Sequence, residues 1–349
     1  MSAPESSRIQ SVSELPAVLA IDGGNSKTDV ALVADDGTML SSVRGPGASH
    51  EEHGVAGAMR ILGGIVADGA QKAGIAHDGA VARHTSACLA GADLPSEEVE
   101  LTAALRGQGW SATAVVVNDT FAVLRAGLAD DSSSGAGGVA VTCGAGINCV
   151  AVAPDGRTAR YLALQSLTGD WGGGRQLAPA MLWHAMRGED GRGPATGLGP
   201  AIAAHFGLAS VSDVAIAVYQ GRLGENDLIT TVPALFRVAA GGDEVARRLV
   251  IRQAEEVCLM AVAAMRRLGI PPSGTVIVLG GGLLQAGDPL LASALDAEFA
   301  AHAPGATLRV ADVPPVVGAA LLGLDHLGLG PAACERLRQG FGKPASWPR

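Results

Sequence analysis

Residues 18–29 read Val-Leu-Ala-Ile-Asp-Gly-Gly-Asn-Ser-Lys-Thr-Asp, and this stretch decides the expected fold. Its apolar start predicts a buried strand over 18–23, and the glycines predict a turn before a second strand over 28–34. A third strand over 38–43 follows the Asp-Gly turn at 35–37, so the chain is expected to open as an antiparallel meander. Backbone N–H groups of the glycine turn, with Lys27, suit a phosphate, and Asp22 suits a hydrated divalent cation beside it. The alternative is an ordinary glycine-rich hairpin.

The composition is that of a globular chain with a large core. Of the 349 residues, 48% are hydrophobic and 17% charged, which allows two domains and disfavours disorder. The net charge of −9 and the lack of a basic run argue against a nucleic-acid partner. Residues 1–17 are expected to be a flexible leader without a signal-peptide core, and no apolar stretch reaches the ~20 residues of a membrane span. We therefore expect a cytoplasmic protein with no membrane partner.

The cysteines are expected to be reduced and buried, because their number is odd and no Cys-x-x-Cys pair occurs. Cys143 and Cys149 lie around a glycine turn and could face each other across a hairpin. A metal or cluster role there has little support, since no further ligand residues lie nearby.

The opening pattern recurs about 120 residues later, which indicates a duplicated fold. A strand over 138–142 leads into Cys143-Gly144-Ala145-Gly146-Ile147-Asn148, a second strand covers 149–153, and an Asp-Gly turn follows at 155–156. Residues 130–138, rich in serine and glycine, are expected to connect the two halves.

Three further segments place ligand-suited residues at the ends of strands. The strand over 114–117 ends in Asn118-Asp119, where the aspartate is either the N-cap of a helix over 120–127 or a carboxylate in a ligand crevice. The glycine runs at 172–174 and 280–282 are costly in backbone entropy, and close approach of a ligand is one reason to keep them. Strands are also expected over 84–90, 275–279 and 307–311, and helices over 52–74, 95–107, 175–187, 196–206, 211–220, 224–239, 243–268, 289–302, 316–327 and 331–341.

Taken in order, these motifs resemble the actin-like ATPase and sugar-kinase superfamily, in which two similar domains clamp a nucleotide. The Asp-Gly-Gly-x-Ser-Lys-Thr form at 22–28 and the Ala-Gly-Ala-Asp segment at 90–93 are most similar to the BadF/BadG/BcrA/BcrD-type ATPase family, which includes N-acetylglucosamine kinase. The resemblance implies an α/β fold of two actin-like (ribonuclease H-like) domains with mixed sheets flanked by helices. The expected domains are 18–129 and 130–330, with a helical insert at 175–268 in the second, followed by a C-terminal helix and tail at 331–349.

The resemblance also implies a function: an ATP-dependent kinase that phosphorylates a hexosamine or hexose hydroxyl, with N-acetylglucosamine or glucosamine at position 6 expected. It implies ATP and Mg²⁺ as cofactors, a small-molecule sugar substrate and a homodimer. Asp119 would be the catalytic base, and Asp22 would hold Mg²⁺ through water. The phosphates would contact Gly23, Gly24, Asn25, Ser26, Lys27 and Thr28 on one side and Thr142, Gly144, Ala145 and Gly146 on the other. The adenosine would contact Gly280, Gly281 and Gly282, and the sugar Ser49, His50, Asn118, Asp170 and Trp171.

Two departures from the family pattern concern the sugar and the second phosphate turn. Hexosamine kinases of the family usually carry Gly-Asp-Glu-Gly-Ser near the sugar, whereas this chain has Gly-Asp-Trp-Gly-Gly-Gly at 169–174. Cys-Gly-Ala-Gly at 143–146 stands where Gly-Thr-Gly-Ser is common. The alternatives are an ATPase that activates a 2-hydroxyacyl-CoA dehydratase-type enzyme through an iron–sulfur cluster, and a non-catalytic sugar or nucleotide sensor.

Overall fold

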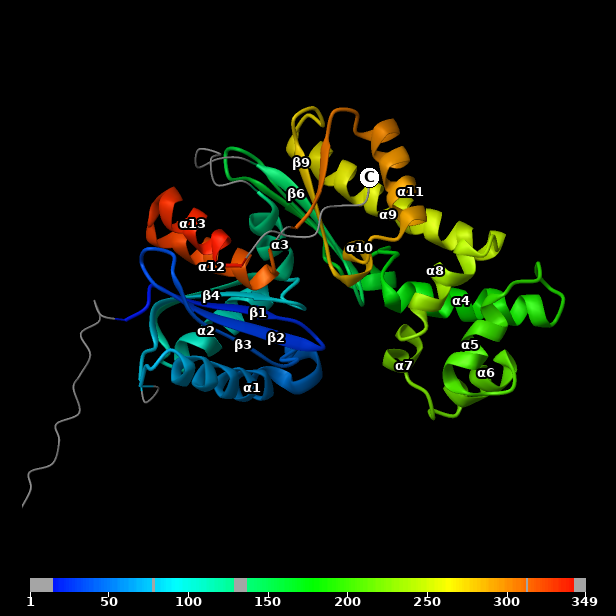
Figure 1. The fold of residues 1–349 in the computed structure, drawn as a ribbon, viewed down its shortest axis with the longest axis horizontal. Coiled ribbons are helices and arrows are strands. Elements are labelled where there is room, and N and C mark those ends of the chain that lie inside the picture. The colour runs from blue at the N-terminus through cyan, green and yellow to red at the C-terminus, as the bar shows by residue number, and fades with distance from the viewer. Residues whose placement is uncertain (1–14, 77–78, 129–136, 312, 342–349) are drawn as a thin grey trace, which may run out of the picture. The chain divides into compact units, whose positions relative to one another are not determined.

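The computed structural model describes residues 15–76, 79–128, 137–311 and 313–341 (Figure 1). Contacts among these residues divide the chain into two compact units. Unit 1 contains the described residues up to 128 and those from Ala311 onward, and unit 2 contains 137–310. Most of the expected leader, most of the expected connection at 130–138 and the end of the expected tail lie outside the described residues.

Unit 1 is built on a mixed five-stranded sheet in the order β3-β2-β1-β4-β5. β1 pairs antiparallel with β2, and β2 with β3, which confirms the predicted meander. β4 runs parallel to both β1 and β5. The strands are β1 (Val18–Gly23), β2 (Lys27–Val33), β3 (Met39–Pro46), β4 (Ala82–Leu89) and β5 (Ser111–Asn118).

Helices cover both faces of this sheet (Figure 1). Successive strand residues point to opposite faces, so each strand contributes to two cores. Leu19 and Ile21 pack with α1 and α2 on one face, whereas Val18 and Ala20 pack with α3, α12 and α13 on the other. The helices are α1 (His50–Lys72), α2 (Pro95–Gly107), α3 (Asp119–Gly127), α12 (Pro315–Leu327) and α13 (Gly330–Gln339).

Helix α12 lies in unit 1, although the sequence analysis placed residues up to 330 in the second domain. Its apolar side completes the core over β1, and it packs very closely on α3. A Cβ added to Gly318 would lie 1.9 Å from the Ala122 carbonyl oxygen, so only glycine permits this helix separation. Chain order alone favours the second domain for this helix, whereas the structure shows that it returns to complete the core of the first sheet.

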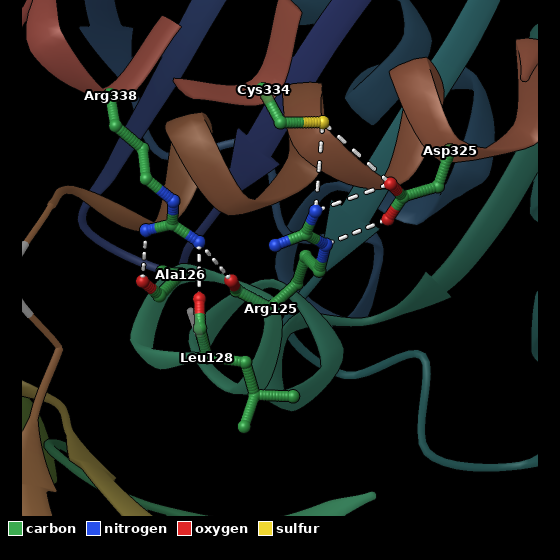
Figure 2. A network of polar contacts seen from close by, with 6 residues as sticks. All are labelled: Arg125, Ala126, Leu128, Asp325, Cys334 and Arg338. Carbon is green, nitrogen blue, oxygen red and sulfur yellow. Dashed lines mark hydrogen bonds and ion pairs between the residues drawn. The ribbon is translucent and has the colours of Figure 1, made fainter. Parts of the chain in front are cut away.

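Two arginines link α3 to its neighbouring helices α12 and α13 (Figure 2). Arg338 donates hydrogen bonds to the carbonyl oxygens of Arg125, Ala126 and Leu128, at 2.8, 2.6 and 2.6 Å. These are carbonyls at the end of α3, where a cation is favoured by the helix dipole. Arg125 in turn pairs with Asp325 of α12, at 2.7 Å. The polar network therefore joins three helices on one face of the sheet.

Unit 2 repeats the sheet topology of unit 1, with the order β10-β9-β6-β7-β8. The β6–β7 hairpin corresponds to β1–β2, and β9 runs parallel to β6 as β4 does to β1, which confirms the predicted duplication. The edge strand β8 was not predicted. The strands are β6 (Gly138–Cys143), β7 (Ile147–Val152), β8 (Thr158–Arg160), β9 (Val276–Gly280) and β10 (Thr307–Val310).

The remaining helices belong to unit 2, where one core joins the sheet to the helical insert. The helix expected over 224–239 is two helices, because the Thr231 hydroxyl donates to the Leu228 carbonyl and Pro233 lies at the start of the next helix. The helices are α4 (Gly174–Glu189), α5 (Leu198–Phe206), α6 (Val211–Tyr219), α7 (Glu225–Ile229), α8 (Val232–Ala240), α9 (Glu244–Leu268), α10 (Gly282–Gln285) and α11 (Pro289–His302), with a 3-10 turn at Gln165–Leu167.

By length and apolar composition, no single described helix could cross a membrane, and α5 and α6 pass the same test only as a pair bent by 59°. All five cysteines are free and buried, as predicted. The expectation that Cys143 and Cys149 face each other is wrong, because Cys143 pairs with Ile147 and Cys149 with Val141.

Candidate active site

In unit 1 the predicted acidic residues meet at one edge of the sheet. The parallel strands β1, β4 and β5 end in register, since Gly23 lies opposite Leu89 and Leu89 opposite Asn118. Asp22 therefore lies at the same edge as the start of α3, which begins at Asp119. Carboxyl ends of parallel strands are the usual ligand edge of such sheets.

Asn118, and not Asp119, is the N-cap of α3. Its side-chain oxygen accepts from the Thr120 backbone N–H at 3.0 Å and from the Thr120 hydroxyl at 2.5 Å. Its side-chain amide donates to Asp93 at 2.7 Å, and its backbone N–H donates to Glu98 at 3.1 Å. The buried Asn118 side chain thus fixes the end of β5 to the segment after β4. The alternative that Asp119 is the cap is wrong.

Asp119 is a partly buried carboxyl with a raised pKa. Burial raises its pKa from 3.8 to about 6, and the backbone N–H groups of Thr120 and Asp119 oppose the shift. A carboxylate whose pKa is moved toward neutrality is suited to accept a proton and later release it. The position and the pKa of Asp119 are those expected of a general base.

The pKa of Asp22 is raised more than that of Asp119. Burial, followed by the charges of Asp119 and Asp29, raises its pKa from 3.8 to about 7, while Lys27 and Arg44 oppose the shift. Asp29 already has a partner, because Arg44 contacts both of its oxygens at 2.7 and 2.9 Å. Burial and the neighbouring carboxylates thus disfavour the charged form of Asp22, and a cation bound beside it would favour that form.

The turn between β1 and β2 presents backbone and a cation beside Asp22. The Gly24 N–H donates to the Lys27 carbonyl at 2.9 Å, and the Ser26 and Lys27 side chains are exposed. Thr28 is fully buried, and its hydroxyl has no hydrogen-bond partner among the described residues. Of the predicted phosphate contacts in this turn, Ser26 and Lys27 have exposed side chains, Asn25 is half-buried, and Thr28 lies beneath the turn.

Besides Asn118, two further predicted sugar contacts, Ser49 and His50, belong to unit 1. Ser49 precedes α1 and is buried, and His50 is its first residue. A Cβ on Gly91, whose φ is +78°, would lie 3.1 Å from the His50 ring, so the start of α1 touches the segment after β4. The Nδ1 atom of His50 is buried and has no partner among the described residues. The segment after β4 therefore has the start of α1 on one side, through Gly91 and His50, and the end of β5 on the other, through Asp93 and Asn118.

Unit 2 brings three glycine segments together at the corresponding edge of its sheet. Thr142 of β6 lies opposite Gly280 of β9, so the turn at 144–146 and the run at 280–282 begin side by side. Gly281 has a φ of +85°, and a Cβ there would lie 2.4 Å from the Cys143 carbonyl oxygen. The third segment, 172–174, bonds to the turn: the Gly174 N–H donates to the Gly144 carbonyl at 2.9 Å.

Asp170 and Trp171, the other predicted sugar contacts, belong to unit 2. Asp170 accepts a hydrogen bond from the Thr168 hydroxyl at 2.5 Å. The Arg252 guanidinium lies 3.9 Å from the centre of the Trp171 ring, a cation–π contact. Trp171 also packs against the core of unit 2, so part of its ring surface is used in structure.

The model of the BadF/BadG/BcrA/BcrD ATPase family matches residues 19–323. The chain belongs to this family. It is 25% identical over 273 residues to an N-acetylmuramic acid/N-acetylglucosamine kinase of Clostridium acetobutylicum, an alignment that covers 76% of this chain and 85% of the relative. It is 24% identical over 191 residues to an N-acetyl-D-glucosamine kinase of Dictyostelium discoideum, with 54% of this chain and 59% of the relative covered.

Solved structures show that the BadF-type chain has the sugar-kinase fold. A candidate N-acetylglucosamine kinase from Chromobacterium violaceum is similar with a TM-score of 0.68 and 23% identity, over 88% of this chain and 98% of the other. A ROK family glucokinase from Streptomyces griseus, in complex with glucose and AMPPNP, is similar with a TM-score of 0.53 and 15% identity, over 89% and 98%. The predicted family and fold class are confirmed.

The donor set of this BadF-type edge fits a hydrated divalent cation. Among the described residues, no group of three or more His, Cys, Asp or Glu side chains is arranged to hold a metal ion directly. Mg²⁺ usually keeps several waters and binds through one or two carboxylates and the substrate phosphates. Asp22, a carboxyl whose charged form a cation would favour, meets that requirement.

Cys143 and Cys149 do not form a ligand pair for an iron–sulfur cluster, because they lie opposite Ile147 and Val141 and both are buried. Burial raises the pKa of the Cys143 thiol to about 12 and raises that of Cys149 further. A cluster ligand must be a thiolate, and both thiols lie in the apolar core. These two cysteines are therefore core residues of the duplicated hairpin.

Asp93 and Gln253 are candidate site residues that the sequence analysis did not include. Asp93 lies in the short segment between the end of β4 at Leu89 and the start of α2 at Pro95, and an aspartate soon after a strand was the available signal. Gln253 is a fully buried amide within the apolar stripe of α9. Gln253 lies three residues after Val250 and four before Val257, the spacing of one buried helix face, and a polar residue at this spacing is the corresponding signal in the sequence.

Proposed function

We propose that this protein is an ATP-dependent sugar kinase that transfers the γ-phosphoryl group to a hydroxyl of a hexosamine or hexose. The observation that carries the proposal is the pair of partly buried carboxylates, Asp22 and Asp119, at the carboxyl edge of the unit 1 sheet. Membership of an ATPase family and the sugar-kinase names of its relatives support the nucleotide and the acceptor class.

Phosphoryl transfer requires alignment, charge neutralisation and a group that accepts the proton of the attacking hydroxyl. In our proposal Asp119 accepts that proton, because burial has moved its pKa toward neutrality. Lys27 and Ser26 contact the phosphates from unit 1, together with the backbone at 23–25. Thr142 and the turn at 144–146 supply a hydroxyl and N–H groups from unit 2, and Gly280–Gly282 accommodate the adenosine.

Mg²⁺, when bound, would neutralise charge on the phosphates of ATP, and Asp22 is the residue that would hold it through water. The support is electrostatic: burial and the charges of Asp119 and Asp29 raise the pKa of Asp22, and a bound cation would favour its charged form.

The acceptor is proposed to be N-acetylglucosamine or glucosamine, phosphorylated at position 6. The name of the Clostridium acetobutylicum relative supports this choice. Ser49, His50 and Asn118 line the sugar side in unit 1, and Asp170 and Trp171 are proposed to add contacts from unit 2. Trp171 replaces the usual glutamate of the family motif, so the hydrogen bonds to the sugar differ from those of the family pattern.

We further propose a cytosolic homodimer. Free, buried thiols at all five cysteines support a reducing compartment. The dimer rests on the family resemblance, and light scattering coupled to size-exclusion chromatography tests it directly.

The proposal is tested by measuring ADP release from ATP and Mg²⁺ across a panel of hexoses and hexosamines. We expect one amino sugar to stimulate release in the wild type, and the Asp119→Ala protein to lose this stimulation by about 10²–10⁴-fold. Phosphate released without any sugar dependence, or an Asp119→Ala protein as active as the wild type, would overturn the assignment.

A further inference from the structure

Helix α9 reaches the glycine segment of unit 2 through Gln253. This side chain is fully buried, and its Oε1 atom accepts a hydrogen bond from the Gly173 backbone N–H at 2.9 Å. Its Nε2 atom is also buried and has no hydrogen-bond partner among the described residues. A buried amide is costly unless its groups are paired, so its place in an otherwise apolar helix face needs a reason.

The glycine segment fills the space between Gln253 and the turn at 144–146. A Cβ on Gly172 would lie 2.7 Å from Nε2 of Gln253, and a Cβ on Gly173, whose φ is +72°, would lie 2.4 Å from the Gly146 carbonyl oxygen. Neither glycine therefore leaves room for a side chain, and the segment is held from both sides. The run of glycines is accounted for by protein contacts on each side.

Two backbone hydrogen bonds then join the segment to the turn. The Gly174 N–H donates to the Gly144 carbonyl at 2.9 Å, and the Arg175 N–H donates to the Ala145 carbonyl at 2.8 Å. Because both bonds end on carbonyls of the turn, a shift of the segment would change the direction of the turn's own N–H groups. Bonds of this kind are sensitive to changes of a few tenths of an ångström.

We propose that Gln253 is a positioning residue that sets the turn at 144–146 for binding of the nucleotide phosphates. The inference rests on the proposed function, in which this turn contacts the phosphates of ATP. Gln253 acts through Gly173 and does not itself contact the nucleotide. Loss of its acceptor removes the 2.9 Å hydrogen bond of the buried Gly173 N–H, which favours movement of the segment and of the turn bonded to it.

The test is isothermal titration of Mg·ADP into the wild type and three variants, with thermal unfolding of each. Gln253→Met preserves shape but removes the acceptor, and we expect about tenfold weaker binding of Mg·ADP. Gln253→Glu retains an acceptor in either protonation state, and binding within about threefold of the wild type is expected. Met265→Leu is the matched control, because Met265 is buried in the same helix about 18 Å further along. It should leave ADP binding unchanged.

A double-mutant cycle separates positioning from general loss of stability. Gly173→Ala forces the same segment against Gly146, so its effect on ADP affinity should not add to that of Gln253→Met. If Gln253→Met binds Mg·ADP as tightly as the wild type, or if Gln253→Glu is weakened equally, the inference is wrong although the kinase proposal stands. A wild-type protein that does not bind Mg·ADP at all overturns the proposed function itself.

Discussion

Replacing Asp22 by asparagine should stabilise the nucleotide-free protein while removing its proposed metal-holding group. In the wild type, burial and the charges of Asp119 and Asp29 raise the Asp22 pKa from 3.8 to about 7. At about 1.4 kcal/mol per pKa unit, this rise corresponds to an upper limit of about 4 kcal/mol of destabilisation at high pH. Solvent screening of the partly exposed carboxylate reduces this figure, and we expect a gain of about 2 kcal/mol for Asp22→Asn.

The pH dependence gives this prediction its sign. Above pH 7 the folded wild type holds Asp22 charged at a cost, and as pH falls toward 4 the folded state takes up a proton that the unfolded state does not. The wild type therefore recovers stability on acidification, whereas the asparagine variant has no such group. The difference in the free energy of unfolding between the two should be largest at pH 8 and close to zero near pH 4.

The assay is thermal or urea unfolding in EDTA at pH 8, 6 and 4. We expect Asp22→Asn to raise the unfolding midpoint by about 4–8 °C at pH 8. Asp155→Asn is a matched control from the hairpin turn of unit 2, because hydrogen bonds from Arg157 lower the pKa of that exposed carboxyl. Its loss should not stabilise the protein. The reasoning would be refuted by an Asp22→Asn protein that is less stable than the wild type at pH 8, or by an increase in the unfolding midpoint at pH 4 as large as that at pH 8.

Further predictions concern the base, the pocket, the helix packing and the second turn. Asp119→Asn should reduce kcat by about 10²–10⁴-fold, and the wild-type kcat/KM should fall below about pH 6 as this carboxyl is protonated, both measured by coupled ADP assay. Asp93→Ala should raise KM for the sugar about tenfold or more in the same assay, because Asn118 loses a partner. Gly318→Ala should lower the free energy of unfolding by about 2 kcal/mol or more, since its Cβ would meet a carbonyl of α3. Gly64→Ala, where nothing lies within 4 Å of the added Cβ, should raise it by about 0.5 kcal/mol, and urea unfolding measures both changes. Thr142→Asp should weaken Mg·ADP binding about tenfold, because the new carboxylate repels the phosphates. Titration calorimetry measures the affinity, and an unchanged value would contradict the prediction.

Local pattern was sufficient for most elements of this fold. Helix α2 has the predicted bounds. Strand β1 ends at the predicted residue, because a short apolar run followed by Asp-Gly leaves little choice of strand end. The duplication was equally visible, since both hairpins carry the same glycine turn. The break between α7 and α8 was missed because Thr231 competes for a helix carbonyl, an effect that periodicity does not report.

Contacts between distant segments were the part that sequence could not supply. The bond between Asn118 and Asp93 joins residues 25 apart, and the bond between Gln253 and Gly173 joins residues 80 apart. The glycine run at 172–174 was interpreted as room for a ligand, whereas the structure fills that room with Gln253 and the neighbouring turn. Glycine needed for close approach looks the same in sequence whether the neighbour is a ligand or the chain itself.

The duplicated hairpins differ in charge at equivalent places, and this difference divides the chemistry between the units. Asp22 lies opposite Asp29 in the β1–β2 hairpin, and Thr142 lies opposite Asn148 at the same place in β6–β7. Two carboxylates favour a cation, and a hydroxyl with an amide favours the neutral hydrogen bonding that a phosphate accepts. The proposed division, with cation and base in unit 1 and neutral phosphate contacts in unit 2, therefore follows from electrostatics.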